Sequence, residues 1–524
     1  MTTLQYLLNM CSRNVCSKFP LCECVLLAFV IVFSTFPLSF IFTARDVKYR
    51  CFIPECENIT ETTYNPEWLK DFVPFQHELP SSCYRYALSN DGTCSRHNTV
   101  LNETIRCDKF IFQREEITIV HDFGIFCEDN LWKLTIIGTL SGIGEIVCFS
   151  YAGFISDRYG RGKLIILSVS MSSMISIVRS FSTNYTMYAF LEFFDTVFCA
   201  AMFGASLVLV MELVSPKQRD IANLLICFFY TIGQWIVGVT AWLSPSWRMM
   251  IRVLHIPGLM ILLLFFAIPE TRTLVFLTYK RNRAKEIVPE EEGLNEMKDT
   301  GTITKDQVEE VELQGFWDVM KEKVLLLRAI RCSLLWIGSN FLYYGLTLYS
   351  VTISEDIYVN FVLSVAIDIP AILTYYYGSQ KFRRRWTMLV AFMTTGVCCL
   401  CVGFIEEELY WTRLLIFLLG KCGAAVVFTL IFVFTTELFP TSSRHSILSL
   451  CSMIGKIGSL LAPQLPLLAR MNHAAPLMIF GIIAVTAGIL SLFFPETVDT
   501  KLPETIEEAV NMGNISVDNN KIKI

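Results

Sequence analysis

The chain has 524 residues, of which 53% are hydrophobic and only 17% are charged, and its mean hydropathy is +0.49. Soluble domains carry about a quarter charged residues, so this composition excludes a disordered chain and argues against a single soluble domain. The formal net charge is -5 and the basic residues form no single patch, which excludes a nucleic-acid-binding protein. The class that fits is a polytopic membrane protein.

Twelve apolar runs are long enough to cross a bilayer as helices, which takes about 20 residues each. They cover residues 21–43, 131–153, 163–183, 187–211, 218–242, 247–268, 331–351, 357–378, 387–405, 410–434, 446–470 and 473–494. The first run is too long for a secretory signal and lacks a small-residue cleavage site, so we expect it to remain as a helix.

Two polar insertions, 44–130 and 269–330, divide these runs and set the predicted organisation of the chain. In chain order it comprises an N-terminal segment 1–20, an N-terminal six-helix half 21–268 that includes the loop 44–130, a linker 269–330, a C-terminal six-helix half 331–494 and a tail 495–524.

Charge in the short loops predicts the side on which each loop lies. Basic residues follow the second, fourth and eighth runs, whereas acidic residues such as Glu406, Glu407 and Glu408 occupy alternate loops. Because cytoplasmic loops are enriched in lysine and arginine, both termini and the linker are predicted to be cytoplasmic. The loop 44–130 then faces the outside of a multi-pass protein that we expect in the plasma membrane.

The cysteines of the 44–130 loop support its predicted position outside the cell. The loop contains six of the chain's 19 cysteines: Cys51, Cys56, Cys83, Cys94, Cys107 and Cys127. An even set in an oxidising compartment indicates a disulfide framework, for which six cysteines allow 15 pairings. Two sequons, at Asn58 and Asn102, are candidate glycosylation sites. We expect no metal site and no cofactor.

An internal repeat relates the two halves. Residues 212–216 read ELVSP and residues 437–441 read ELFPT, and the tripeptide PET occurs at both 269–271 and 495–497. Two six-helix halves in the same orientation are typical of transporters that move one half against the other. The substrate site is then expected between the halves, near the middle of the membrane.

Residues 153–163, between the second and third runs, read GFISDRYGRGK and closely resemble the loop signature of the major facilitator superfamily. Gly153 allows close approach of two helices, Asp157 can accept hydrogen bonds at a helix N-terminus, and the basic residues can pair across the halves. Plain positive-inside topology is the alternative explanation. The candidate latch residues are Gly153, Asp157, Arg158, Gly160, Arg161, Glu212, Arg219, Glu437 and Arg444.

Further segments resemble the organic cation/anion transporter family within that superfamily. They are CED at 127–129, WR at 247–248, ELFPT at 437–441 and PET at 495–497, together with the cysteine-rich first loop. The resemblance covers essentially the whole chain. It implies an all-α membrane protein with twelve helices in two six-helix pseudo-repeats, and transport of small organic ions by alternating access. Gln380 departs from the family pattern, which often has an acid there.

Ionisable residues deep inside spans are candidates for the substrate site. Lys456 and Lys421 lie near the middle of their spans, where a charge costs about 2.5–3.5 kcal/mol on insertion scales. A structural pair of either lysine with Asp368 is one explanation. Two lysines against one aspartate would still leave one positive charge for a ligand. Glu145 is a candidate for proton or cation coupling, whereas Arg179, Glu192 and Asp195 are expected to form a structural set.

The family resemblance extends to the site. The position of Lys456 looks basic in carriers of anions or zwitterions, which favours organic anions or carnitine-like zwitterions as substrates. Residues at family positions that line the site complete the prediction: Tyr343, Tyr344, Phe203, Tyr230 and Gln234. Aromatic rings supply contact area and attract quaternary ammonium groups, although each ring alone is equally explained by packing.

Other functions compete with this carrier. An organic cation carrier is the first alternative, and a non-transporting receptor or scaffold is the second. The chain has no P-loop, no HExxH motif and no nucleophile–base set, so we do not expect an enzyme. The expected partners are a small organic ion, the lipid bilayer and a possible coupling or exchange ion, without nucleic acid.

Overall fold

The computed structural model describes residues 29–512, apart from the stretch 268–315 and short gaps. These gaps are residues 55, 58–62, 77–78, 89–98, 115, 160, 214–218, 352, 354–355, 406–408, 441–442, 466–467, 469–473, 498–502 and 504. Cys94, Asn58 and Gly160 therefore lie outside the described residues.

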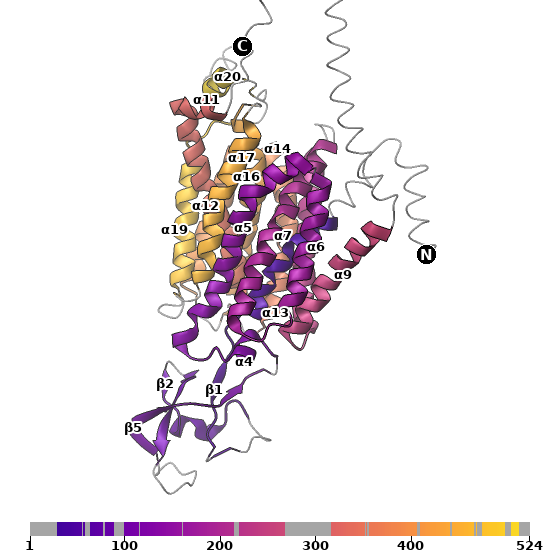
Figure 1. Cartoon of the computed structure of the whole chain (residues 1–524). Coiled ribbons are helices and arrows are strands. Elements are labelled where there is room, and N and C mark those ends of the chain that lie inside the picture. Colours follow the sequence, from indigo (N-terminus) through magenta and orange to yellow (C-terminus); the bar gives the residue numbers. More distant parts are fainter. Residues whose placement is uncertain are drawn as a thin grey trace, which may run out of the picture.

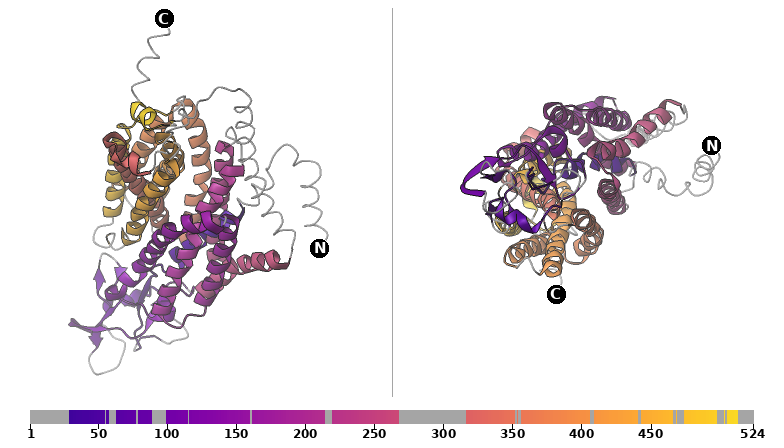
Figure 2. Two further views of the ribbon diagram at one scale, coloured as in Figure 1. Left: turned by 45° about the horizontal axis from the view of Figure 1, so that its top comes forward. Right: turned by 90° about the horizontal axis from the view of Figure 1, so that it is seen from below.

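Helices occupy every predicted span (Figure 1). Those of the N-terminal half are η2 (Val32–Ser39) with α3 (Phe40–Thr43), α5 (Trp132–Tyr159), α6 (Arg161–Arg179), α7 (Tyr185–Leu213), α8 (Arg219–Leu243) and α9 (Trp247–Ala267). Those of the C-terminal half are α12 (Lys323–Ser350), α13 (Ile357–Ala366) with α14 (Asp368–Lys381), α15 (Arg384–Val402), α16 (Tyr410–Leu438), α17 (Arg444–Leu461) with η8 (Ala462–Gln464), and α19 (Ala475–Ser491). The two halves lie side by side (Figure 2).

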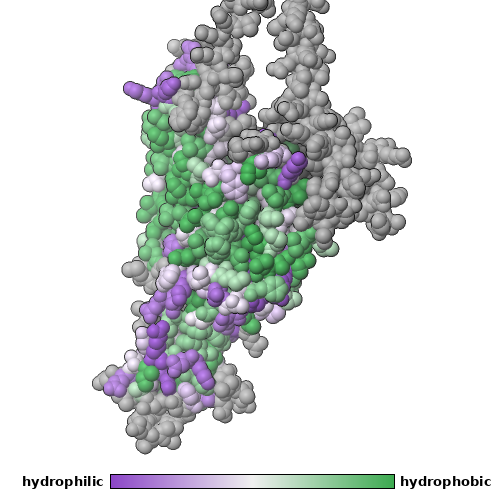
Figure 3. Space-filling view, in the orientation of Figure 1, coloured by the Kyte–Doolittle hydropathy of each residue, from purple (hydrophilic) through white to green (hydrophobic). Residues whose placement is uncertain are grey.

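The outer surface of the bundle is apolar. Among the described residues, nine helices are long and apolar enough to span a membrane, and two shorter apolar helices occupy the first and twelfth spans. Large side chains such as Phe190, Leu415 and Ile482 are more than half exposed there. The visible face of the bundle is correspondingly hydrophobic, and hydrophilic residues gather toward its two ends (Figure 3). Lipid is the environment in which such a surface is stable.

The two ends of the helix bundle carry different segments of the chain. Residues 44–130, termed the loop domain, extend from one end, which we call the loop face (Figure 1). The short helices α11 (Phe316–Lys321) and α20 (Ile506–Asn511) lie at the opposite end, the terminal face.

Two spans depart from the continuous helices that their sequences predict. The first span runs as a 3₁₀-helix through Pro37, whose ring removes a backbone donor. The eighth is divided into α13 and α14 at Ile367, three residues before Pro370. Proline is tolerated in the first turn of a helix but not in its interior, which explains this break. The break makes Asp368 the first residue of α14.

The two halves contact one another closely toward the loop face. α5 and α17 run side by side. A side chain at Gly138 would collide with Pro463 in η8, and one at Gly142 would press tightly against the backbone of Leu460. Gln464 in η8 also hydrogen-bonds Thr139 at 2.5 Å. This contact between α5 and α17 is called the seam below. On the other side of the bundle, α8 packs against α13. The halves are therefore closed on the loop face.

The loop domain adds β-structure to the predicted helical fold. Its strands are β1 (Tyr49–Cys51), β2 (Phe75–Gln76), β3 (Leu79–Pro80), β4 (Tyr84–Leu88), β5 (Thr99–Arg106) and β6 (Phe110–Phe112). They form three antiparallel pairs, β1–β6, β2–β3 and β4–β5. Asn102, one of the two predicted glycosylation sites, lies on β5.

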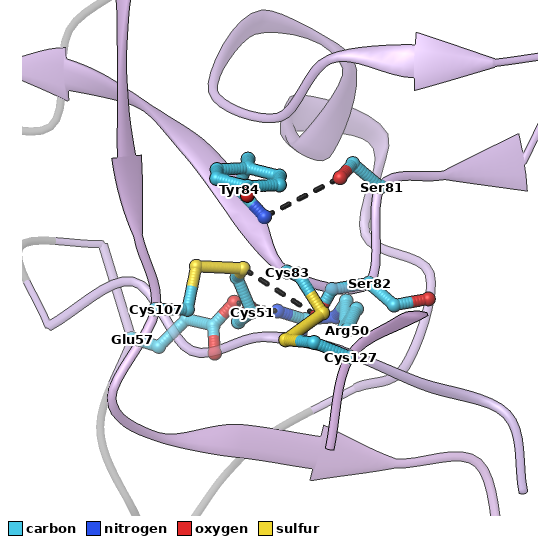
Figure 4. The surroundings of a disulfide bond; sticks show 9 residues. All are labelled: Arg50, Cys51, Glu57, Ser81, Ser82, Cys83, Tyr84, Cys107 and Cys127. Atoms are coloured by element: carbon cyan, nitrogen blue, oxygen red, sulfur yellow. Dashed lines mark hydrogen bonds and ion pairs between the residues drawn. A yellow bond between two sulfur atoms is a disulfide. The ribbon is translucent and has the colours of Figure 1, made fainter. Parts of the chain in front are cut away.

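Disulfides hold these short strand pairs together. Cys51 is bonded to Cys107 and Cys83 to Cys127, and the two bridges lie close to one another (Figure 4). Cys56 is also disulfide-bonded. Isolated two-stranded sheets are marginally stable in water, so covalent links supply the stability that a small core does not.

One buried ion pair completes the core of the loop domain. Arg50 is fully buried and donates to Glu57 at 2.6 Å and to the carbonyl oxygens of Thr63 and Tyr64. Burial raises the pKa of the Glu57 carboxyl above its ordinary value and outweighs the opposing attraction of Arg50.

The loop domain is fastened to both halves of the bundle. Glu116 accepts a hydrogen bond of 2.5 Å from the hydroxyl of Tyr358 on α13 of the C-terminal half, and it is also bonded to Arg45 within the loop domain. Arg248 at the start of α9 forms an ion pair of 2.9 Å with Asp122. The loop domain thus bridges the two halves on the loop face.

Candidate functional site

A cavity lies between the two halves in the interior of the bundle. Its walls come from α7 and α8 of the N-terminal half and from α12, α14 and α16 of the C-terminal half. The lining residues are Phe203, Cys227, Tyr230, Thr231, Tyr343, Asp368, Ile372, Ala425, Phe428 and Thr429. The cavity is small in this conformation, with a volume of about 30 Å³. Four of the eight predicted substrate residues, Phe203, Tyr230, Tyr343 and Asp368, therefore line one cavity.

Asp368 is the charged residue of that lining. One carboxylate oxygen, Oδ2, accepts a hydrogen bond of 2.8 Å from the Tyr343 hydroxyl. Gln234 donates to the same hydroxyl at 3.3 Å, so the predicted amide also belongs to this group. The other oxygen, Oδ1, is buried and has no hydrogen-bond partner among the described residues. A buried oxygen of this kind is suited to receive a cationic group.

Lys421 lies behind Tyr343 and is fully buried. Its Nζ donates to the carbonyl oxygen of Tyr343 at 3.0 Å and to the Thr347 hydroxyl at 2.5 Å. The ammonium also lies 3.7 Å from the centre of the Tyr343 ring. Lys421 and Asp368 attract one another electrostatically without direct contact. Protein groups thus satisfy Lys421, which indicates a supporting role beneath the cavity wall.

Lys456 does not pair with Asp368, which is the structural alternative that the sequence leaves open. Its Nζ lies 2.9 Å from Oε2 of Glu145, so the ion pair joins α17 of the C-terminal half to α5 of the N-terminal half. The pairing of Lys456 with Asp368 is therefore wrong, and so is the expectation of one uncompensated positive charge. Both side chains keep some exposure, 12% for Lys456 and 24% for Glu145.

Aromatic side chains connect this ion pair to the cavity. Lys456 donates to the Tyr344 hydroxyl at 3.5 Å, and that hydroxyl lies 3.4 Å from the hydroxyl of Tyr230. Tyr230 packs edge-on against Phe203, with ring centroids 5.4 Å apart. All eight predicted substrate residues therefore belong to one contiguous group that spans both halves.

Phe428 is the main residue that sequence reasoning missed. Its ring stacks on Tyr343 with centroids 4.3 Å apart and forms part of the cavity wall. Residues two helical turns apart share a face, so Phe428, seven positions after Lys421, could have been found by its spacing from that lysine. Thr429 and Thr231 carry no comparable signal, because hydroxyl side chains are common throughout membrane helices.

The latch residues lie near the terminal face. Gly153, Asp157 and Arg158 belong to the last two turns of α5, and Arg161 begins α6. Glu212 lies in the last turn of α7 and Arg219 begins α8. The structure describes the backbone, but not the side chains, at Gly153, Asp157, Arg158, Glu212 and Arg219.

The latch residues of the C-terminal half, Glu437 and Arg444, form contacts at helix ends. Arg384 at the start of α15 forms an ion pair with Glu437 in the last turn of α16. The backbone N–H of Arg384 donates to Glu496 at 3.0 Å, and Arg444 donates to the carbonyl oxygen of Phe439 at 3.5 Å. These contacts join helix ends within one half. The expected pairing of basic residues across the halves stays a prediction.

The predicted structural set in the N-terminal half is confirmed. Arg179 forms ion pairs with Glu192 and Asp195, and all three side chains are fully buried. The Asp195 carboxylate also accepts hydrogen bonds of 2.5 Å from Ser172 and Ser176. The set ties α6 to α7.

Comparison with known proteins identifies the family. A sequence model described as Major Facilitator Superfamily matches residues 118–463 and 357–516. "Solute carrier family 22 member 4" of Mus musculus is 27% identical over 501 residues, covering 90% of this chain and 88% of that protein. "Organic cation/carnitine transporter 2" of Homo sapiens is 26% identical over 498 residues, with 91% and 88% covered.

Solved structures show the same fold. The xylose transporter XylE from E. coli, in a partially occluded inward open conformation, superposes with a TM-score of 0.56 at 16% identity, covering 73% of this chain and 93% of that one. Its inward open conformation gives a TM-score of 0.53. The predicted all-α fold in two halves is confirmed. The chain therefore belongs to the major facilitator superfamily of membrane transporters.

Proposed function

We propose that the protein carries a small zwitterion of the carnitine type across the membrane by alternating access. The charge balance of the site carries this proposal. Lys421 and Lys456 are matched by Asp368 and Glu145, so the four ionisable groups have no net formal charge. A zwitterion leaves that balance unchanged, whereas a simple ion adds an uncompensated charge at a depth where charge is costly.

The two ends of a zwitterion fit different parts of the site. The cationic end is placed in the cavity, where Oδ1 of Asp368 lacks a partner among the described residues and Tyr343, Tyr230 and Phe428 present aromatic rings. Rings attract a quaternary ammonium through their quadrupole, and a carboxylate adds charge attraction. The carboxylate end is placed toward Lys456, beyond Tyr344.

An organic cation carrier is the second candidate. The observation that favours it is the cavity lining, in which Asp368 is the charged residue and no lysine of the described chain takes part. The human relative is named an organic cation/carnitine transporter, and this name covers both candidate substrate classes. An enzymatic role is excluded because the family consists of transporters.

Uptake by proteoliposomes distinguishes these candidates. We expect saturable uptake of a labelled quaternary-ammonium zwitterion, and weaker uptake of a quaternary ammonium and of a carboxylate of matched size. Vesicles without the protein provide the background. Preference for the simple ammonium would favour the cation carrier, and absence of saturable uptake for every probe would contradict both candidates.

We also propose that the loop domain faces the outside of the plasma membrane and that both termini are cytoplasmic. The basic short loops on the opposite side and the disulfides of the loop domain support this orientation. Treating protein from its native membrane with glycosidase should lower its apparent mass, and Asn58→Gln/Asn102→Gln should abolish that change. If reagents that label free thiols from outside find Cys51 and Cys107 reactive, the orientation or the oxidised state is wrong.

A further inference from the structure

The ion pair between Glu145 and Lys456 lies at one end of the seam. Going from the loop face toward the terminal face, Gly138 meets Pro463, Gly142 meets Leu460, and Glu145 meets Lys456. Steps of three or four residues on both helices keep these contacts on one face of each. The pair is therefore positioned by backbone packing and joins the two halves that must move during transport.

Lys456 is placed so that two carboxylates can compete for it. Glu145 occupies one side of its ammonium at 2.9 Å, while Tyr344 lies 3.5 Å away in the direction of Tyr230 and the cavity. The partial exposure of both charged side chains shows that neither is sealed by the surrounding helices. A substrate carboxylate arriving from the cavity would meet an ammonium that already has a counter-ion.

A carrier must also return after it has released its substrate. While its site closes around no ligand, any unpaired charge inside it loses water and gains nothing in return. A positively charged site without a counter-ion can therefore close around a substrate but cannot close empty. A carrier with such a site can only exchange one substrate molecule for another. A site whose lysine has a carboxylate of its own can close empty.

We propose that Glu145 replaces the substrate carboxylate on Lys456 in the empty carrier, so that the protein returns empty and performs net transport rather than obligatory exchange. This inference rests on the proposed function. In the loaded carrier Lys456 is shared between the Glu145 carboxylate and the substrate carboxylate, and the ammonium group of the substrate supplies the second positive charge. In the empty carrier Glu145 alone compensates Lys456. Glu145 is thus a specificity and positioning residue for the transport cycle, and it holds no substrate itself.

The test measures two fluxes of the same labelled zwitterion in proteoliposomes. Net uptake is measured into vesicles without internal substrate, and exchange into vesicles preloaded with unlabelled substrate. Wild-type protein should show both. Glu145→Gln should lower the ratio of net uptake to exchange at least tenfold while exchange persists, because only the empty return needs the counter-ion. Glu145→Asp keeps the negative charge and should retain most of the wild-type ratio.

A double variant separates this role from general damage. In Glu145→Gln/Lys456→Gln the site has neither charge, so the flux ratio should return toward the wild-type value even though substrate binds more weakly. Misfolding would lower both fluxes together and leave their ratio unchanged. A wild-type protein that only exchanges, or a Glu145→Gln variant with an unchanged ratio, overturns the inference. Absence of any flux in wild-type protein contradicts the proposed function instead.

Discussion

Removing the ammonium of Lys456 is expected to weaken binding of a carboxylate-bearing substrate by about tenfold to a hundredfold. A hydrogen bond to a charged group contributes roughly 1.5–3 kcal/mol, which corresponds to that range of affinity. The comparison must be made between Glu145→Gln and Glu145→Gln/Lys456→Gln. In the single Lys456→Gln variant the Glu145 carboxylate would remain and repel the substrate carboxylate, so the loss of affinity would not measure the missing contact alone.

Binding of three probes to the detergent-solubilised protein checks this expectation. The zwitterion and the matched carboxylate should lose affinity in the double variant, and the quaternary ammonium should not. Equal losses for all three probes would show that Lys456 supports the fold of the site rather than recognising a carboxylate. Unchanged affinity for the zwitterion in a well-folded double variant contradicts the placement of its carboxylate.

Asp368→Asn is expected to lower affinity for the zwitterion and for the quaternary ammonium by about tenfold to a hundredfold, and to spare the carboxylate probe. Asparagine has the shape of aspartate and still accepts the hydrogen bond from Tyr343, so the cavity keeps its form. What is lost is a charge-assisted contact with the cationic group, which contributes roughly 1.5–3 kcal/mol.

Two controls keep this prediction independent of folding. Asp356→Asn makes the same chemical change on the loop face, where the side chain is 76% exposed and lies 3.8 Å from Arg114, and it should have no effect. Asp368→Asn also removes the negative charge that attracts buried Lys421. Asp368→Asn/Lys421→Met avoids leaving that lysine alone in the interior. If the double variant binds the quaternary ammonium as well as wild-type protein does, Asp368 is not the cation contact.

The sequence by itself determined the architecture of this protein. A helix that crosses a membrane must satisfy its own backbone and expose apolar side chains, so hydropathy predicts the spans without knowledge of their packing. The repeated ELVSP/ELFPT and PET segments showed two equivalent halves, and the family resemblance selected residues that form one contiguous group. Local chemistry also predicted the oxidised cysteines and the ion pairs of Arg179 with Glu192 and Asp195.

Other features depended on how the helices meet. Pro370 explains why the helix of the eighth span breaks before Asp368. The apolar residues of that span nevertheless continue without interruption, so the sequence predicts a single helix. The strand pairs of the loop domain are short and were not predicted, because disulfides rather than alternating hydrophobic residues define them.

Only the tertiary structure decided which charge compensates which. Periodicity tells which residues share one face of a helix, but it does not tell which other helix that face will meet. Glu145 and Lys456 lie in different halves, and their contact exists because small residues let α5 and α17 approach along the seam. The sequence alone suggested an unmatched lysine. The packing of the two halves supplies its carboxylate, and with it the reason why an empty site can close.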